Sequence, residues 1–448
     1  MHKRFALIGH PLGHSLSPEI HAAVMAAAGI DGVYELLDIA PEDVPARMPS
    51  LLRDYDGFNA TIPHKIAVMP YLDGLSDAAR RCGAVNTVFR RRGHNTDAAA
   101  FLSARLPLAG ARALLLGNGG VAATMASETI AAGAAELVVA PHTAERGEAF
   151  LADLRRRFPD TPCALSLAVG DDARAAALAR ATVLLNGTPV GMWPHAGGCP
   201  VDPAAIPAGI AAFDPVYNPT PTRLVLAVRK AGGRAVGGLR MLVRQAVAAQ
   251  QIWNPGLSID ADALVDRLLP ELVAALYRKN AVKLLLVGFM GAGKTSVGRA
   301  LASRLALPFA DLDDEIAAAA GRPIPAIFAE SGEAAFREIE ARVARDVLTR
   351  PGSEVVASGG GFPTFAANRA LVRETNTLVV AIEAPFETLW ARIAGGSDRP
   401  LARRRGDTAA LHARRAPVYH DFCDIAVETS PDLAPADVAA RIAALLAP

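Results

Sequence analysis

Short apolar runs alternate with alanine-rich stretches along the whole chain. The runs have the length of strands that are buried on both faces, and the stretches between them are long enough for helices. Strands that alternate with helices are typical of α/β folds with mostly parallel sheets. We therefore predict an α/β protein whose strands include residues 5–8, 113–116, 137–140, 183–185, 284–287 and 378–382.

Length and two changes of pattern predict several domains. The chain has 448 residues, whereas one domain usually has about 100 to 200. A first boundary is expected at residues 106–112, ahead of a new strand, and a second between residues 270 and 283, where a helical segment runs directly into another strand. The second linker has little Gly or Ser, so we expect the two halves to be held close together.

Charge and apolar content favour small-molecule chemistry. The 46 basic and 45 acidic residues nearly cancel, so the chain lacks the positive field that nucleic acid or an anionic membrane requires. The four cysteines form no C-x-x-C pair, which indicates thiols in a reducing compartment. The N-terminus is expected to form a first strand and not a signal peptide, and no apolar run reaches the ~20 residues of a membrane span. We expect a cytoplasmic enzyme with small-molecule partners, whose oligomeric state the pattern does not predict.

A glycine-rich motif follows the strand at residues 284–287. Residues 288–295 read G-F-M-G-A-G-K-T and fit G-x-x-x-x-G-K-[ST] at every fixed position. A strand, a glycine-rich turn and a helix in this order expose successive backbone N–H groups to a triphosphate. We expect Lys294 to reach the β- and γ-phosphates of ATP and Thr295 to hold Mg²⁺. The expected ATP site is completed by Gly291, Ala292, Gly293 and Ser296.

A second glycine-rich turn follows the strand at residues 113–116. Residues 117–122 read G-N-G-G-V-A and precede a helical stretch that runs to about residue 132. Glycines in such a turn let the backbone approach a pyrophosphate, although this spacing departs from G-x-G-x-x-G. By itself the turn fits a dinucleotide site and a plain strand-to-helix connection equally well.

Seven motifs in a fixed order surround this turn and resemble those of shikimate dehydrogenase over about residues 3–275. They are G-H-P-L-G-H-S-L-S-P (9–18), N-A-T-I-P-H-K (59–65), G-A-V-N-T-V (83–88), N-T-D (95–97), N-G-T-P-V-G-M (186–192), D-P-V-Y-N-P-T-P-T (214–222) and G-G-L-R-M-L-V-R-Q-A (237–246). The resemblance implies a split dehydrogenase over residues 1–278. An N-terminal α/β substrate domain of residues 1–105 and 238–278 would flank a Rossmann dinucleotide-binding domain of residues 106–237.

The same resemblance implies that Lys65 and Asp97 form a catalytic pair. Reduction of a ring ketone needs a proton donor, and only six of the 46 basic residues are lysines, so a lysine inside a motif suits that role. A polyhydroxylated carboxylate substrate needs hydroxyl and amide groups around it. Tyr217 either lines this pocket or packs in the core. The other expected substrate ligands are Ser15, Ser17, Asn59, Thr61, Asn86 and Gln245.

The cofactor region departs from the family at one place. An arginine that binds the 2′-phosphate of NADP is expected after the second strand of the Rossmann domain, where this chain has Pro141-His142-Thr143 and, further on, Arg146. Arg146 and a protonated His142 remain to bind this phosphate, so we expect a preference for NADP(H) that is weaker than a dedicated arginine gives. The other expected cofactor residues are Gly117, Asn118, Gly119, Gly120, Val121, Ala122 and Gly238.

Five motifs beyond the first glycine-rich loop resemble shikimate kinase over about residues 282–446. They are F-A-D-L-D (309–313), F-R-E-I-E (336–340), S-G-G-G (358–361), D-R-P-L (398–401) and R-R-A-P-V-Y (414–419). The resemblance implies that residues 282–448 form a P-loop domain with a parallel sheet, similar to nucleoside monophosphate kinases.

The kinase resemblance also implies roles for single residues. Asp311 is expected to hold Mg²⁺ together with Thr295, and Asp313 to bind the substrate hydroxyls and activate the attacking one. Planar guanidinium groups suit a carboxylate, and a basic segment flanked by glycines suits a lid. We therefore expect Arg337 and Arg415 to bind the shikimate carboxylate, Arg399 to close over the phosphates, and the turn of Gly359, Gly360 and Gly361 to approach the ring.

These expectations combine into a bifunctional enzyme of aromatic amino-acid biosynthesis. NADPH-dependent reduction of 3-dehydroshikimate would give shikimate, and ATP with Mg²⁺ would convert it to shikimate 3-phosphate. One alternative is an NAD-linked quinate or shikimate dehydrogenase coupled to a kinase of another small hydroxy compound. A second is a metabolite-sensing regulator without turnover, which the presence of Lys65, Asp97, Lys294, Asp311 and Asp313 disfavours.

Overall fold

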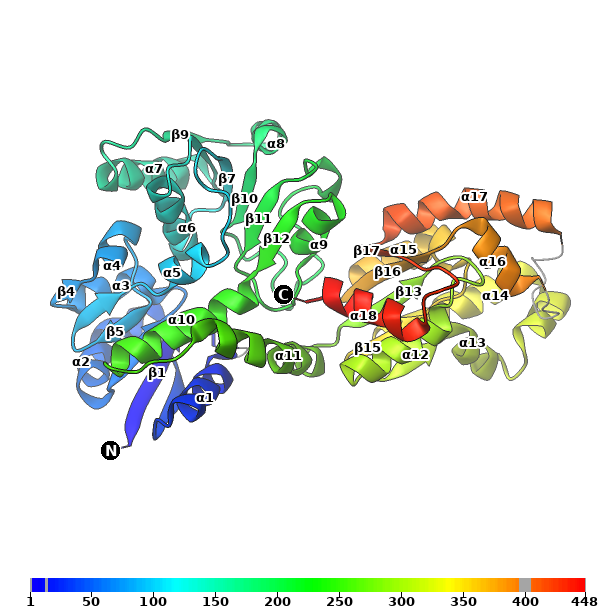
Figure 1. The fold of residues 1–448 in the computed structure, drawn as a ribbon, viewed down its shortest axis with the longest axis horizontal. Helices are drawn as coiled ribbons and strands as arrows, with labels where there is room; N and C mark the ends of the chain where they lie inside the picture. The colour runs from blue at the N-terminus through cyan, green and yellow to red at the C-terminus, as the bar shows by residue number, and fades with distance from the viewer. Residues whose placement is uncertain (1, 13–14, 395–403, 448) are drawn as a thin grey trace.

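The computed structural model describes residues 2–12, 15–394 and 404–447, which form three sheets with helices packed against them (Figure 1). All six strands expected from the apolar runs are present, and each is slightly longer than its run. In the described ranges no helix is both long and apolar enough to cross a membrane.

The first sheet is mixed, with the strand order β2-β1-β3-β5-β6-β4. β1 pairs in parallel with β2 and β3, whereas β5 is antiparallel to β3 and β6. The strands are β1 (Lys3–Gly9), β2 (Gly32–Asp38), β3 (Gly57–Ala60), β4 (Gly74–Leu75), β5 (Thr87–Phe89) and β6 (Arg92–His94). The helices are α1 (Ser17–Ala28), η1 (Pro41–Asp43), α2 (Val44–Asp54), α3 (His64–Ala67), η2 (Met69–Tyr71), α4 (Asp77–Cys82) and α5 (Asp97–Leu102).

Two later helices return to this first sheet. α10 (Gly238–Trp253) and α11 (Ala261–Lys279) bury apolar side chains against α1 in one hydrophobic cluster. The unit around the first sheet is therefore built from both ends of the first 279 residues, with its strands from the start and two helices from the end, and the second sheet is inserted between them.

The second sheet is fully parallel, with the order β9-β8-β7-β10-β11-β12. This is the order of doubly wound dinucleotide-binding folds, in which ligands bind at the carboxyl ends of the two central strands, here β7 and β10. The strands are β7 (Arg112–Leu116), β8 (Glu136–Ala140), β9 (Ala164–Leu167), β10 (Val183–Asn186), β11 (Ala211–Asp214) and β12 (Arg234–Gly237). The helices are α6 (Gly120–Ala131), α7 (Ala144–Arg157), α8 (Asp171–Arg180), η3 (Pro203–Ala205) and α9 (Arg223–Lys230).

The third sheet is also parallel, with the order β14-β15-β13-β16-β17. Its central strand β13 is buried along its whole length, as its unbroken apolar sequence predicts. The strands are β13 (Lys283–Val287), β14 (Phe309–Asp311), β15 (Glu354–Ala357), β16 (Thr377–Glu383) and β17 (Ile425–Glu428). The helices are α12 (Lys294–Leu305), α13 (Leu312–Ala320), α14 (Ile324–Leu348), η4 (Phe362–Thr364), α15 (Ala366–Glu374), α16 (Phe386–Ile393), α17 (Arg405–Phe422) and α18 (Pro435–Leu445).

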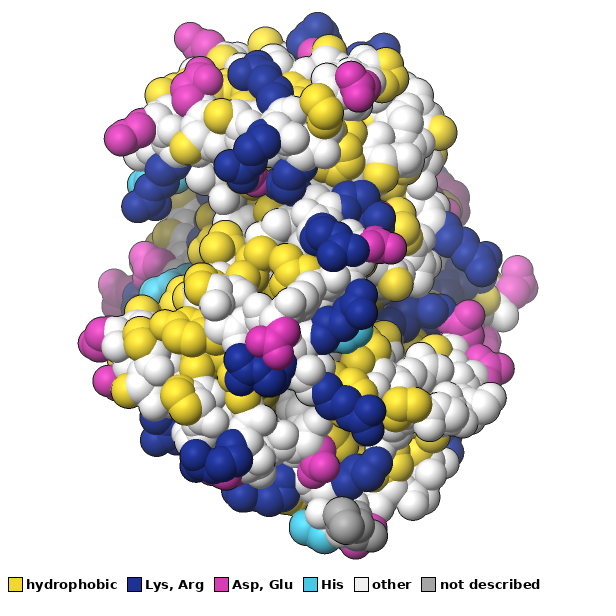
Figure 2. Space-filling view, turned by 90° about the vertical axis from the view of Figure 1, so that its left-hand side faces the viewer, with side chains coloured by type: hydrophobic (Ala, Val, Ile, Leu, Met, Phe, Trp, Pro, Cys, Tyr) yellow, Lys and Arg dark blue, Asp and Glu magenta, His cyan; other side chains and the backbone are white. Residues whose placement is uncertain are grey.

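The end of the molecule formed by α4 and α7 carries mixed charge. Figure 2 shows basic side chains across the middle of this face with acidic side chains among and around them. Local ion pairs join Arg80 to Asp77 and Arg156 to Asp153. Such pairs reduce the positive field of the arginines, in line with the nearly neutral composition.

Candidate active sites

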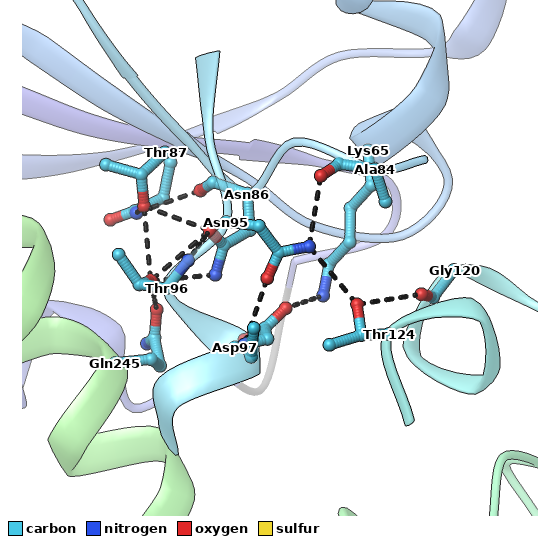
Figure 3. Close-up of polar contacts among 12 residues, drawn as sticks. Lys65, Ala84, Asn86, Thr87, Asn95, Thr96, Asp97, Gly120, Thr124 and Gln245 are labelled. Carbon is cyan, nitrogen blue, oxygen red and sulfur yellow. Dashed lines mark hydrogen bonds and ion pairs between the residues drawn. The ribbon is translucent and has the colours of Figure 1, made fainter. Parts of the chain in front are cut away.

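The expected pair Lys65 and Asp97 is formed between the first and second sheets. Lys65 lies on α3, directly after the cis peptide Ile62–Pro63, and Asp97 begins α5. Lys65 Nζ donates to Asp97 Oδ2 at 2.6 Å, and the two side chains are only 14% and 8% exposed (Figure 3). A charged pair that is largely shielded from water interacts strongly and holds its geometry. The lysine ammonium is thus fixed at a defined point between the two sheets.

Asn95, two residues before Asp97, links the units of the first and second sheets. Asn95 Nδ2 donates to Ala84 O at 3.0 Å and to Thr124 Oγ1 at 3.2 Å, and Thr124 lies on α6 of the second sheet (Figure 3). Asn95 Oδ1 accepts from the backbone of Ala98 and so fixes the first turn of α5. The loop that carries Asp97 is therefore held by contacts to both the first and the second unit.

Two expected substrate ligands belong to a buried polar network beside the pair. Asn86 Nδ2 donates to Thr96 Oγ1 at 2.9 Å, and Asn86 Oδ1 accepts from Thr96 N at 2.8 Å. Thr96 Oγ1 also contacts Gln245 Oε1 at 3.5 Å, which links α10 to the loop before Asp97 (Figure 3). This network brings hydroxyl and amide groups together within reach of Lys65, as a hydroxylated substrate requires.

Asn59 lies beneath this network. Its amide donates to Asn86 O and Thr87 Oγ1, both at 2.9 Å, and its carbonyl accepts from Tyr34 Oη at 2.7 Å. The side chain is 4% exposed. Both amide protons are therefore used within the protein and hold β3 to β5, and a direct contact of Asn59 with the substrate stays a prediction.

The remaining expected substrate ligands lie outside this network. Ser15 accepts from the backbone of Ser17 at the start of α1, and Thr61 is half-buried before the cis peptide. Tyr217 is half-buried against the cluster of α1, α10 and α11, and burial raises the pKa of its hydroxyl. Tyr217 thus packs on core residues, while its contact with the substrate stays a prediction.

The turn at residues 117–122 has the geometry of a pyrophosphate-binding loop. Gly117 has a φ of 86°, and a Cβ atom there would lie 2.9 Å from Gly187 O. Gly119 caps α6, and a Cβ atom on it would meet no heavy atom within 4 Å, so its backbone faces open space at a helix N-terminus. A Cβ atom on Gly120 would lie 3.5 Å from Lys65 Cδ. The loop, including Val121 and Ala122 in the first turn of α6, therefore fits a dinucleotide next to the lysine.

The other expected cofactor residues surround this loop in part. Asn118 Nδ2 donates to Arg146 O at 3.4 Å, and Arg146 lies in the first turn of α7 with an exposed side chain. His142 is exposed just before that helix. Gly238 begins α10, where a Cβ atom would clash with the carbonyl oxygen of Pro215, so close backbone packing requires glycine there.

The second glycine-rich loop joins β13 to α12. Gly291 and Gly293 have φ angles of 81° and 90°, which glycine adopts without strain. Lys294 Nζ donates to the loop carbonyls of Gly288 at 3.0 Å and Phe289 at 3.1 Å. A cavity of ≈ 260 Å³ opens beside the loop, and its lining includes Gly291, Ala292, Gly293, Ser296, Arg392, Thr429, Pro435 and Val438. The loop and the cavity together fit a nucleoside triphosphate.

Oxygen ligands suited to Mg²⁺ lie next to this loop. Thr295 Oγ1 donates to Asp311 Oδ2 at 2.7 Å, and Asp311 Oδ1 accepts from the backbone of Asp313 at 3.1 Å. A hydroxyl and a carboxylate at the mouth of a phosphate loop are the hard ligands that Mg²⁺ prefers. These two side chains therefore fit the metal.

Asp313 and Arg337 meet at the turn of residues 359–361. A Cβ atom on Gly359 would lie 3.0 Å from Asp313 Oδ1, and one on Gly361 would lie 2.9 Å from an Arg337 terminal nitrogen. Arg337 is 15% exposed and donates to Glu340 at 2.9 Å and to Glu333 at 3.0 Å. Glycine at this turn thus lets a carboxylate and a fixed guanidinium approach the backbone closely.

Arg415 approaches the same turn from α17. It interacts with Tyr419, whose hydroxyl donates to Gly360 O at 2.5 Å. Burial raises the pKa of Tyr419 to about 12, so this hydroxyl keeps its proton at neutral pH. The two arginines expected to bind a carboxylate are therefore brought to one turn from two different helices.

Family comparisons agree with this arrangement. A profile for the shikimate dehydrogenase substrate binding domain matches residues 7–88, and one for shikimate kinase matches residues 290–447. The NADP(+) shikimate dehydrogenase of Moorella thermoacetica is 38% identical over 279 residues, which cover 60% of this chain and 93% of the relative. This chain belongs to the shikimate dehydrogenase family.

Solved dehydrogenases share the fold of the N-terminal half. Shikimate 5-dehydrogenase from Thermus thermophilus, in complex with NADP(H) and shikimate, is 34% identical, covers 59% of this chain and 97% of its own, and has a TM-score of 0.51. The enzyme from Listeria monocytogenes, in complex with shikimate and NAD, is 26% identical, covers 59% and 96%, and has a TM-score of 0.53. Together with the kinase profile, these relatives confirm a shikimate dehydrogenase fused to a shikimate kinase domain.

The dehydrogenase motifs contain one further buried acid. Asp214, at the end of β11, accepts from Asn186 Nδ2 at 2.9 Å, Thr222 Oγ1 at 2.6 Å and the backbone of Val216 at 3.1 Å. Burial raises its pKa to about 6. Asp214 thus ties the loop after β10 to the N-terminus of α9. Its place within D-P-V-Y was the only signal for it in the sequence.

Sequence reasoning missed several partners of the expected site residues. Thr96, Glu340 and Tyr419 lie inside recognised motifs, so their positions could have been singled out. Thr124 and Tyr34 lie outside every motif, and only the fold brings them to Asn95 and Asn59. Arg399, the expected lid residue, lies outside the described residues.

Proposed function

We propose that this chain reduces 3-dehydroshikimate to shikimate with NADPH and then phosphorylates shikimate with ATP and Mg²⁺. The fusion of the two families supports both activities. The main support for the proposal is that one chain contains two sets of residues arranged as candidate active sites. One is the Lys65–Asp97 pair beside a dinucleotide loop, and the other is a phosphate loop beside Asp311.

In the first reaction, we propose that Lys65 donates a proton to the carbonyl oxygen of the substrate. NADPH supplies the hydride when it is bound at the loop of residues 117–122. Asp97 holds the lysine ammonium through one carboxylate oxygen and orients a substrate hydroxyl through the other. The network of Asn86, Thr96 and Gln245 positions the ring so that hydride and proton arrive on opposite ends of one carbonyl bond.

In the second reaction, we propose that Asp313 binds the shikimate hydroxyls and orients the attacking one. ATP supplies the phosphoryl group, and Thr295 with Asp311 holds the metal ion that neutralises its charge. Arg337 and Arg415 bind the shikimate carboxylate from two sides of the turn at residues 359–361. Positioning and charge neutralisation are most of what phosphoryl transfer requires.

The division of the chain follows from these sites. We propose that residues 1–105 and 238–278 form the substrate domain, residues 106–237 the Rossmann domain and residues 282–448 the kinase domain. Each unit contains one of the three sheets. We also propose a cytoplasmic location, which unpaired cysteines and the biosynthetic substrates support.

The dehydrogenase and kinase reactions can be assayed separately to test this function. Oxidation of shikimate and of quinate is measured with NADP and with NAD, and ATP-dependent phosphorylation is measured with shikimate. The proposal predicts oxidation with NADP and phosphorylation of shikimate. Preference for NAD and quinate would support the alternative dehydrogenase, and turnover in neither assay with retained shikimate binding would support a regulator.

We expect Arg146→Ala to weaken the preference for NADP over NAD by roughly 10- to 100-fold, the loss expected for one charge-assisted hydrogen bond. Arg146 is exposed at the N-terminus of α7, where helix dipole and guanidinium both favour a phosphate. The measurement is the ratio of kcat/KM for the two cofactors in wild type and variant.

Arg155→Ala is the matched control, because Arg155 lies in the last turn of the same helix. Its ratio should equal that of the wild type. A ratio unchanged by Arg146→Ala, or a wild-type preference for NAD, would show that Arg146 does not bind the 2′-phosphate.

A further inference from the structure

The dehydrogenase half, residues 2–279, contacts the kinase half at the amino ends of the third-sheet strands. Arg223, the first residue of α9, donates to Asp424 Oδ1 at 2.9 Å and to Thr377 O at 2.8 Å. Thr377 begins β16, and Asp424 directly precedes β17. The phosphate loop follows the carboxyl end of β13, at the opposite end of the strands. The contact therefore leaves the kinase site open.

The contact has an apolar centre. Leu226 of α9 and Tyr277 of α11 are 2% and 4% exposed and belong to the same hydrophobic cluster as Val282, Leu378 and Cys423 of the kinase half. The linker is pinned at Asn280, which donates to Asn218 Oδ1 at 2.5 Å and whose carbonyl accepts from Ser353. The cavity at the linker measures only ≈ 10 Å³. The two halves are therefore packed together and not merely tethered.

The last turn of α9 binds the ends of two kinase helices. Lys230 Nζ donates to His420 O at 2.6 Å and to Cys423 O at 2.7 Å, at the end of α17. Arg229 donates to Leu445 O at 2.8 Å and to Ala447 O at 2.9 Å, at the end of α18. Terminal carbonyls of a helix have no partner within the helix, and cations are favourable there. The dehydrogenase half thus caps helices of the kinase half.

Of these two helices, α17 reaches the candidate shikimate pocket. Tyr419, in its last turn, donates to Gly360 O at 2.5 Å, and Arg415 lies one turn earlier and interacts with Tyr419. Gly359 and Gly361 of the same turn lie next to Asp313 and Arg337. Pro417 lies between Arg415 and the C-terminal end of α17, so that end is coupled to Arg415 through Tyr419, which contacts both Arg415 and Gly360.

We propose that Arg223 and Lys230 of the dehydrogenase half are positioning residues for shikimate binding in the kinase half. They hold the corner between α17 and β17, and through it Tyr419 and Arg415. The inference rests on the proposed kinase reaction and on Arg415 as a ligand of the substrate carboxylate. The affinity of the kinase half for shikimate would then depend on α9 of the dehydrogenase half.

The test compares Lys230→Met and Arg223→Gln with wild type in the full-length chain. Both changes remove the charge, with a side chain of similar length at residue 230 and a shorter one at residue 223. Carboxylate binding in the ground state affects KM more than kcat, so we expect KM for shikimate in the kinase assay to rise about 3- to 10-fold, with kcat and KM for ATP within about twofold. Lys230→Arg and Arg223→Lys keep the charge and should restore most of the KM.

Lys279→Met is the matched control, because Lys279 is an exposed lysine at the end of α11 beside the same interface. Its KM for shikimate should equal that of the wild type. A purely structural role would lower the active fraction, and hence kcat, without changing KM. An unchanged KM in Lys230→Met would overturn the inference, whereas no phosphorylation by the wild type would overturn the proposed function instead.

Discussion

Lys65→Ala is expected to lower kcat of the dehydrogenase by about 10²- to 10⁴-fold, the contribution typical of one general acid. The ammonium is held by Asp97 at 2.6 Å and is 14% exposed, so water is poorly placed to take over its role. The kinase site is built from residues after 283 and should keep its activity in the same sample. The measurement is the rate of 3-dehydroshikimate reduction at saturating NADPH.

Arg47→Ala serves as the control for Lys65→Ala, because Arg47 is an exposed basic residue on α2 of the same sheet. It should reduce 3-dehydroshikimate at the wild-type rate. If Lys65→Ala reduced 3-dehydroshikimate at the normal rate, Lys65 would not be the proton donor, and its ion pair with Asp97 would have only a structural role.

Lys294→Ala is expected to lower kcat of the kinase by at least about 10²-fold, because it removes the ammonium group that stabilises the negative charge of the phosphoryl group during transfer. Lys294 begins α12 at the loop and donates to the carbonyls of Gly288 and Phe289. ATP-dependent formation of shikimate 3-phosphate is measured while shikimate oxidation with NADP is followed in the same preparation. The second activity should not change.

Arg304→Ala removes a positive charge from the other end of α12 and should phosphorylate shikimate normally. If Lys294→Ala also worked at nearly the wild-type rate, the loop would have only a structural role in this chain.

The parallel sheets could be predicted from the sequence because of how they are buried. β7, β10, β13 and β16 are covered on both faces, so each appears as an unbroken apolar run. β4 and β6 of the mixed sheet have only two and three residues and include Gly74, Arg92 and His94. Such short strands have no apolar pattern, and only pairing with their neighbours defines them.

The candidate sites could be predicted where chemistry dictates local sequence. A phosphate loop needs glycine at positive φ and a lysine at a fixed spacing, so residues 288–295 were recognisable directly. Hydrogen-bond partners that come from another element leave no such local mark. Thr124 looks like any polar residue in an alanine-rich helix, yet the fold places it against Asn95.

The contact between the two halves illustrates the same limit. Arg229 and Lys230 in the last turn of α9 look like ordinary solvated cations at a helix C-terminus. Their partners are carbonyls about 190 to 218 residues further along the chain. Backbone carbonyls are present at every residue, so no sequence pattern indicates which of them these side chains bind.

We propose that one chain carries out both reactions in sequence. The most direct measurement supplies the full-length protein with 3-dehydroshikimate, NADPH, ATP and Mg²⁺ and follows NADPH oxidation together with the product mass. We expect shikimate 3-phosphate, and shikimate alone when ATP is withheld. Shikimate that accumulates without phosphorylation in the complete mixture, or no NADPH oxidation at all, would contradict it.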